Sequence, residues 1–163
     1  MDKKLKNAII KKMMAYFEYN NSHINHTYRV LEYAEELLNI EKGDPNINIP
    51  AAILHDIGIT PCEKKYNSIE GQLQEIVGPP VAREILESLK IDEKIIKEVC
   101  EIVACHHSPG EINTINFKIM WDADWLVNLP DVYDIKDKAK LPEIINKTFM
   151  TKTGLGIAKY LYL

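Results

Sequence analysis

Apolar residues recur at helical spacing along nearly the whole chain, and no other feature of the sequence restricts the available folds as strongly. Residues 3–19, for example, place Leu5, Ile9, Met13 and Phe17 on one side of a helix. No stretch alternates apolar and polar residues for long enough to predict a sheet. With 163 residues, the chain has the usual length of one domain. We therefore expect an all-α fold, a compact single-domain bundle with about seven to nine helices.

Capping residues and helix breakers predict where these helices begin and end. Ser22 and Asp92 suit N-caps, and Pro50 suits the first turn of a helix that follows a loop over residues 41–50. Glycines and prolines predict the main interruptions, in chain order: Gly58 with Pro61, Gly78-Pro79-Pro80, Ser108-Pro109-Gly110, Pro130, and Gly154 with Gly156.

Composition and charge argue against several classes of protein. The formal net charge of −4 does not suit a protein that binds nucleic acid through a basic surface. No apolar run approaches the roughly 18–20 residues of a membrane span, and the first residues lack the apolar block of a secretory signal. The three cysteines form no C-x-x-C pair, which is typical of reduced thiols. We expect a cytoplasmic protein without a nucleic-acid or membrane partner.

Histidines and aspartates stand in apolar surroundings at several places. His26 lies on the second predicted helix, His55-Asp56 ends the apolar segment AAILHDIG, and Asp124 interrupts the apolar helix KIMWDADWLVNL. A buried carboxylate is costly unless it is paired or binds a metal. These four residues could be helix caps and structural ion pairs. Alternatively they converge on one divalent cation, in a nitrogen and oxygen ligand set suited to manganese, iron, cobalt or nickel, with magnesium or zinc as further options.

The order His, His-Asp, Asp resembles the HD-domain metal-dependent phosphohydrolase superfamily. The matching segments are HINHTYRV, AAILHDIG and DADWLVNL, and GPPVAREIL and the helix ending in CHH are also similar. The resemblance spans about residues 22–130, with the C-terminal helices expected to pack on that core. It implies an all-helical fold of the HD type, with His26, His55, Asp56 and Asp124 as metal ligands. Asn128 matches a position that faces substrate in some members.

The departures from this pattern narrow the subfamily. Guanosine-tetraphosphate hydrolases carry a Glu-Asp pair shortly after His-Asp, where this chain has Ile-Gly-Ile-Thr. Cyclic-di-nucleotide phosphodiesterases carry a Lys at about the place of Ile59 and a later Gly-Tyr-Pro, which is absent. Members with two metals add a His where this chain has Gln72 and Gln74. We expect one metal ion, although His106 or His107 would provide part of a second site.

A phosphohydrolase also needs groups that offset phosphate charge and transfer protons. Arg29 lies one turn after His26 and is predicted to contact phosphate, with an ion pair to a neighbouring glutamate as the alternative. Asp56 is predicted both to bind metal and to orient the attacking water. His106, His107 and Asp122 are candidates for proton transfer, although a histidine at a helix C-terminus also stabilises the helix dipole.

The sequence therefore predicts a metal-dependent phosphohydrolase acting on a nucleotide or a similar small phosphate ester. One alternative is an iron-dependent oxygenase that uses two histidines and one carboxylate. Another is a non-catalytic nucleotide-binding or sensory domain of the same fold. The substrate, the resident metal and the oligomeric state stay open, a homodimer through the terminal helices included. Trp121 and Trp125 are interpreted as core residues, with stacking on a nucleobase as the alternative.

Overall fold

Nine helices and no strand make up the computed structural model, which describes all 163 residues. The expected all-α fold and the expected number of helices are therefore confirmed. The helices, in chain order, are α1 (Lys3–Tyr16), α2 (Asn21–Glu41), α3 (Pro45–Leu54), α4 (Ile59–Tyr66), α5 (Gly71–Ser88), α6 (Glu93–Val103), α7 (Ile115–Val132), α8 (Leu141–Thr148) and α9 (Lys152–Tyr162). None of them combines the length and the hydropathy that crossing a membrane requires.

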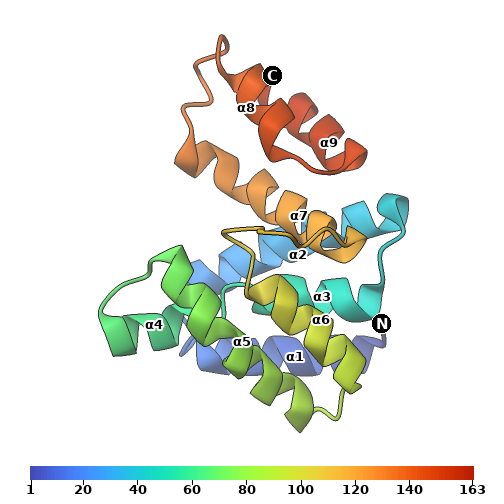
Figure 1. Cartoon of the computed structure of the whole chain (residues 1–163), viewed down its shortest axis with the longest axis vertical. Helices are drawn as coiled ribbons and strands as arrows, with labels where there is room; N and C mark the ends of the chain where they lie inside the picture. The colour runs from blue at the N-terminus through green and yellow to red at the C-terminus, as the bar shows by residue number, and fades with distance from the viewer.

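One apolar core holds these helices together, and α3 lies at its centre. Helix α3 packs against α1, α2, α6 and α7, and eight of its ten residues are buried. Figure 1 shows α2 and α7 crossing the middle of the molecule, with α1, α4, α5 and α6 on one side of them and the α8–α9 pair at the other end. Because other helices pack around α3, the residues that directly follow its C-terminal end, His55 and Asp56, lie inside the molecule.

Helix α3 begins at Pro45, five residues before the predicted start at Pro50, so the loop expected over residues 41–50 is largely wrong. The side chain of Asp44 accepts a hydrogen bond from the Asn46 N–H, and Pro45 occupies the first turn. Pro50 lies inside the helix, where a proline costs about 3 kcal/mol because it lacks an N–H. Burial of the apolar residues around it outweighs that cost.

Helix α5 is continuous through Gly78-Pro79-Pro80, so the predicted break there is wrong. Gly78 is buried against Gly58, in the turn that follows α3. A Cβ atom on Gly58 would lie 2.7 Å from the carbonyl oxygen of Gln74 and 3.1 Å from the Gly78 Cα. The close approach of two glycines therefore fixes α5 against the turn that carries His55 and Asp56.

Other boundaries differ from prediction for similar reasons of packing. Asn20, not Ser22, caps α2, and Pro61 lies in the first turn of α4. Pro130 lies inside α7, near its end. Helix α9 continues through both Gly154 and Gly156, so the predicted interruption there is wrong. A Cβ on residue 154 would overlap the Asp122 carboxylate, and glycine at this position permits the close contact. The cap at Asp92 and the loop at residues 108–110 are confirmed.

Candidate metal centre

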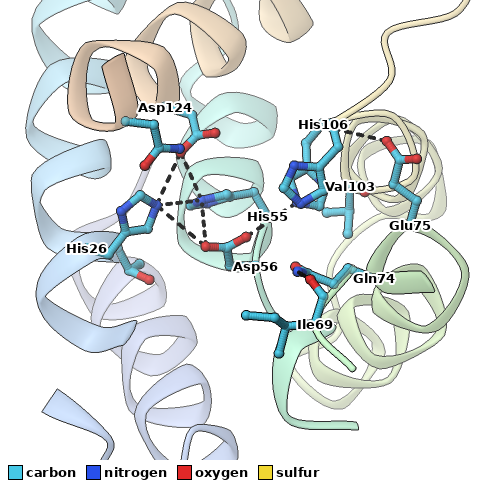
Figure 2. A network of polar contacts seen from close by, with 12 residues as sticks. His26, His55, Asp56, Ile69, Gln74, Glu75, Val103, His106 and Asp124 are labelled. Atoms are coloured by element: carbon cyan, nitrogen blue, oxygen red, sulfur yellow. Dashed lines mark hydrogen bonds and ion pairs between the residues drawn. The ribbon is translucent and has the colours of Figure 1, made fainter. Parts of the chain in front are cut away.

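The four residues singled out as metal ligands come from three separate elements and meet at one place. His26 lies on α2, His55 and Asp56 directly follow α3, and Asp124 lies on α7. Figure 2 shows their side chains directed toward one another. The structure thus brings together residues that are 98 positions apart in the chain, as His26 and Asp124 are.

The distances between the donor atoms suit one shared cation. His26 Nε2 lies 3.3 Å from His55 Nε2 and 3.1 Å from Asp124 Oδ1. Asp56 Oδ2 lies 3.5 Å from His26 Nε2 and 3.4 Å from His55 Nε2. In an octahedral shell with bonds of about 2.1 Å, neighbouring donor atoms lie about 3 Å apart. Small movements of these side chains would therefore seat a divalent ion among them.

The tautomer of His55 is set by the backbone. Its Nδ1–H donates a hydrogen bond of 2.8 Å to the carbonyl oxygen of Ala52, which leaves Nε2 directed at the two carboxylates. A neutral imidazole would then present a lone pair to negatively charged oxygens. Only a proton or a cation between these atoms makes the arrangement favourable, and this is the usual orientation of a metal-binding histidine.

The charges in the cluster shift the ionisation of each member. Burial alone would lower the pKa of His55, but Asp56 and Asp124 raise it well above its ordinary value. Burial alone would raise the pKa of both carboxyls, but the histidines around them hold each pKa below its usual range. Without a metal, the cluster therefore contains ionised carboxylates and a protonated imidazole, and that proton provides the positive charge that a cation would replace.

Asn128 supports Asp124 from one turn further along α7. Its side-chain N–H donates a hydrogen bond of 2.8 Å to Asp124 Oδ1, the same oxygen that faces His26. The contact that the structure records for the Asn128 amide is thus with a candidate ligand. Its predicted contact with substrate remains a prediction.

The two adjacent histidines after α6 have different surroundings. His106 is buried, and its Nε2 lies 3.4 Å from Asp56 Oδ1. Its Nδ1–H donates to the Val103 carbonyl at 2.7 Å, so Nε2 faces the cluster. His107 is exposed, and its ring lies against that of His106 at a tilt of 43°, with ring centroids 3.9 Å apart. Glu75 on α5 holds this turn by accepting hydrogen bonds from the backbone N–H groups of His107 and Ser108. His106 is therefore the inward-facing member of the pair.

Asp122 does not face the cluster, although it lies only two residues before Asp124. Residues two apart on a helix point to nearly opposite sides. Its carboxylate is fully buried and accepts hydrogen bonds from the backbone N–H groups of Met150 and Thr151 and from the Thr151 hydroxyl, at 2.7–2.8 Å. The structure thus assigns Asp122 to the attachment of α9, which contradicts its inclusion among the candidates for proton transfer.

The two arginines of the chain differ in their ion-pair partners. Arg83 forms ion pairs with glutamates on the surface, whereas Arg29 is exposed and has no carboxylate partner. The alternative of an ion pair for Arg29 is therefore not observed.

Trp121 is buried and donates its indole N–H to the Thr148 carbonyl, as a core residue does. Trp125 is partly buried and stacks with Tyr133.

Gln74 is a member of the site that sequence reasoning noticed only as the absence of a histidine. It is buried, and it lies beside His106 and Asp56 in Figure 2, whereas Gln72 is exposed. The signal was its spacing with Gly78, Val81 and Ala82 on one face of α5. The erroneous break after residue 77 concealed that spacing.

Comparison with known proteins identifies the same family that the motifs resemble. The family model of the HD domain matches residues 23–129. No match was found among curated proteins. Among solved structures, the chain is similar to the crystal structure of a predicted HD superfamily hydrolase from an uncultured Thermotogales bacterium, with 27% sequence identity and a TM-score of 0.65. That similarity covers 96% of this chain and 82% of the other.

Proposed function

Because the chain belongs to the HD domain family of metal-dependent hydrolases, we propose that it is a phosphohydrolase that cleaves a phosphate ester of a nucleotide or a similar small molecule. The observation that carries the proposal is the convergence of His26, His55, Asp56 and Asp124. The Nε2 atoms of the two histidines lie 3.3 Å apart, and each lies 3.1–3.5 Å from an oxygen of both aspartates. These donors fit one divalent cation, and the nitrogen and oxygen set favours manganese, iron, cobalt or nickel.

Each residue of the site has a distinct role in this proposal. The four ligands would hold a divalent cation, which would supply a Lewis acid and would lower the pKa of a bound water. Asp56 directs one oxygen toward the ligand histidines and the other toward His106, so it is placed to orient the attacking water and to accept its proton. His106 is placed to donate a proton to the leaving oxygen, because its Nε2 faces the interior of the site.

Arg29 provides the positive charge that a phosphate group requires near the ligands. It lies three residues after His26 on α2, is exposed, and is not occupied by a carboxylate. A guanidinium that is free of ion pairs can bind two phosphate oxygens at once. The oxygenase alternative has less support, because Gln74 rather than a further histidine lies beside His106 and Asp56.

The test is release of inorganic phosphate from a panel of nucleotides and sugar phosphates, with manganese, iron(II), cobalt and nickel each supplied in turn. Wild-type protein should turn over at least one substrate, and Asp56→Ala and His26→Ala should not. His23→Ala is the matched control for His26→Ala and should stay active, because His23 lies one turn earlier on the same helix and outside the cluster. Metal binding without phosphate release would favour the sensory domain, and oxygen consumption with iron would favour the oxygenase.

A further inference from the structure

Gln74 has a buried amide whose two ends differ. Its side-chain N–H donates a hydrogen bond of 2.6 Å to the carbonyl oxygen of Ile69, in the loop before α5. Its side-chain oxygen, Oε1, is buried and has no hydrogen-bond partner. Reversing the amide would place two oxygens against each other, so the Ile69 carbonyl fixes which end is free.

The free end of Gln74 belongs to the candidate site. Three buried side-chain polar atoms lack a hydrogen-bond partner in the whole chain, on Asn48, Gln74 and His106. Asn48 lies near the start of α3 and bonds to Asn116, away from the ligands. His106 Nε2 faces Asp56 Oδ1 at 3.4 Å, so Gln74 Oε1 is the acceptor at the site that has no polar partner. Figure 2 shows the Gln74 amide on the side of the site where Asp56 and His106 lie. A buried acceptor without a partner at this place indicates that a hydrogen-bond donor from outside the protein would complete it.

We propose that Gln74 is a substrate-recognition residue whose Oε1 accepts a hydrogen bond from a hydroxyl group on the leaving group of the phosphate ester. The inference rests on the proposed function, because it places the leaving group on the side of His106. Displacement at phosphorus is in line, so the attacking water and the leaving oxygen lie on opposite sides of the phosphoryl group. What the leaving oxygen carries then extends past His106 to Gln74.

The hydrogen-bonding capacity of Gln74 selects the class of leaving group. Its Nε2 already donates to Ile69, so the free Oε1 can only accept a hydrogen bond. A leaving group without a donor, such as ionised pyrophosphate, would leave this buried oxygen without a partner. A neutral sugar bearing hydroxyl groups would donate to it instead. The favoured substrate is therefore a phosphate monoester of a sugar or nucleoside, rather than a nucleoside polyphosphate cleaved between its phosphates.

The first test compares matched nucleoside 5′-monophosphates that carry ribose, 2′-deoxyribose, 3′-deoxyribose or the dideoxy sugar. Wild-type protein should prefer the substrate with the recognised hydroxyl by at least about tenfold in kcat/KM. Gln74→Met keeps the length of the side chain but has no acceptor, and it should bring that ratio close to one. Gln72→Met, an exposed position on the same helix, should leave the ratio unchanged. Equal turnover of all four substrates by wild type would overturn the proposal without reference to any variant.

A second measurement separates this proposal from the proposed function. Binding of the matched non-hydrolysable phosphonates to the metal-loaded protein is measured directly. If no substrate is hydrolysed but binding still depends on one hydroxyl and Gln74→Met removes that dependence, phosphohydrolysis fails and the role of Gln74 stands. Absence of a hydroxyl preference in both assays overturns the role of Gln74. Loss of a bound metal ion in Gln74→Met would also overturn it, since Gln74 would then be a ligand.

Discussion

Asp122 and Asp124 lie two residues apart on α7, each beside a tryptophan, and the fold treats them in opposite ways. Asp122 faces the α8–α9 pair, where its partners are uncharged N–H and O–H groups, and burial raises its pKa to about 6. Asp124 faces two histidines. Burial would raise its pKa as well, but hydrogen bonds from His26 and His55 hold it well below the ordinary value.

The contrast shows how one helix can carry a structural carboxylate and a reactive one. Neutral donors bond to both oxygens of Asp122, so this carboxylate stabilises the attachment of α9 and does not face the metal centre. Asp124 has ionisable partners whose protons can leave, so a cation can replace them. Substitutions at the two positions should therefore separate stability from metal binding.

The largest expected effect is that of Asp124→Asn on metal binding. The amide removes the negative charge that faces His26 and His55, so phosphate release should fall at least about 1,000-fold and the metal content should fall with it. Elemental analysis of purified protein and the phosphate assay would measure both. Asp131→Asn, an exposed position on the same helix, is the control. Retention of a full metal complement by Asp124→Asn would refute the ligand assignment.

Asp122→Ala should affect stability instead. It leaves the N–H groups of Met150 and Thr151 and the Thr151 hydroxyl without their acceptor, and each lost bond costs about 1 kcal/mol. The free energy of unfolding should therefore fall by roughly 3 kcal/mol in urea titrations, while the metal content stays near one ion per chain. Loss of metal without loss of stability would show that the two aspartates are not separated as described.

Two glycines of α9 provide a finer test of the Asp122 contact. A Cβ on Gly154 would overlap the Asp122 carboxylate, whereas a Cβ on Gly156 meets no atom within 4 Å. Gly154→Ala should lower the free energy of unfolding by about 2 kcal/mol through overpacking. Gly156→Ala should raise it by up to about 1 kcal/mol, since alanine favours the helix. Equal melting temperatures for the two variants would contradict this.

Asn128→Ala should reduce metal affinity less than Asp124→Asn does. It removes the hydrogen bond of 2.8 Å that orients Asp124. Substitutions of groups that orient a ligand typically reduce metal affinity or activity by about 10- to 100-fold. Metal titration monitored by calorimetry would measure the change, and Asn146→Ala, an exposed residue of α8, is the matched control. An unchanged affinity in Asn128→Ala would mean that Asp124 is oriented without this bond.

The smallest expected effect is the change in metal affinity for each pH unit. The raised pKa of His55 means that its imidazole is protonated at neutral pH in the metal-free protein, and the proton must leave before a cation binds. Apparent affinity should therefore decrease about tenfold for each pH unit below the folded pKa of His55. Calorimetry in buffers of different ionisation enthalpy should detect about one proton released per ion. Asp122→Asn should show the same slope, because Asp122 lies outside the cluster.

Local patterns in the sequence carried the fold class and the identity of the clustered residues. Helical spacing of apolar residues is a property of short windows, so it predicted an all-α protein without knowledge of the packing. The cost of placing a charge among apolar neighbours is equally local, and it drew attention to His26, His55, Asp56 and Asp124. The capping function of Asp92 was predictable for the same reason.

Other features depend on which surfaces meet, and no local pattern contains that information. Prolines persist inside α3 and α5 because burial against other helices outweighs their cost. His106 rather than His107 turns inward because the Val103 carbonyl and Glu75 hold that turn. Gln74 reaches the site because two glycines let α5 approach the turn after α3. Each of these outcomes is a balance of long-range contacts, so it exists only once the helices have packed.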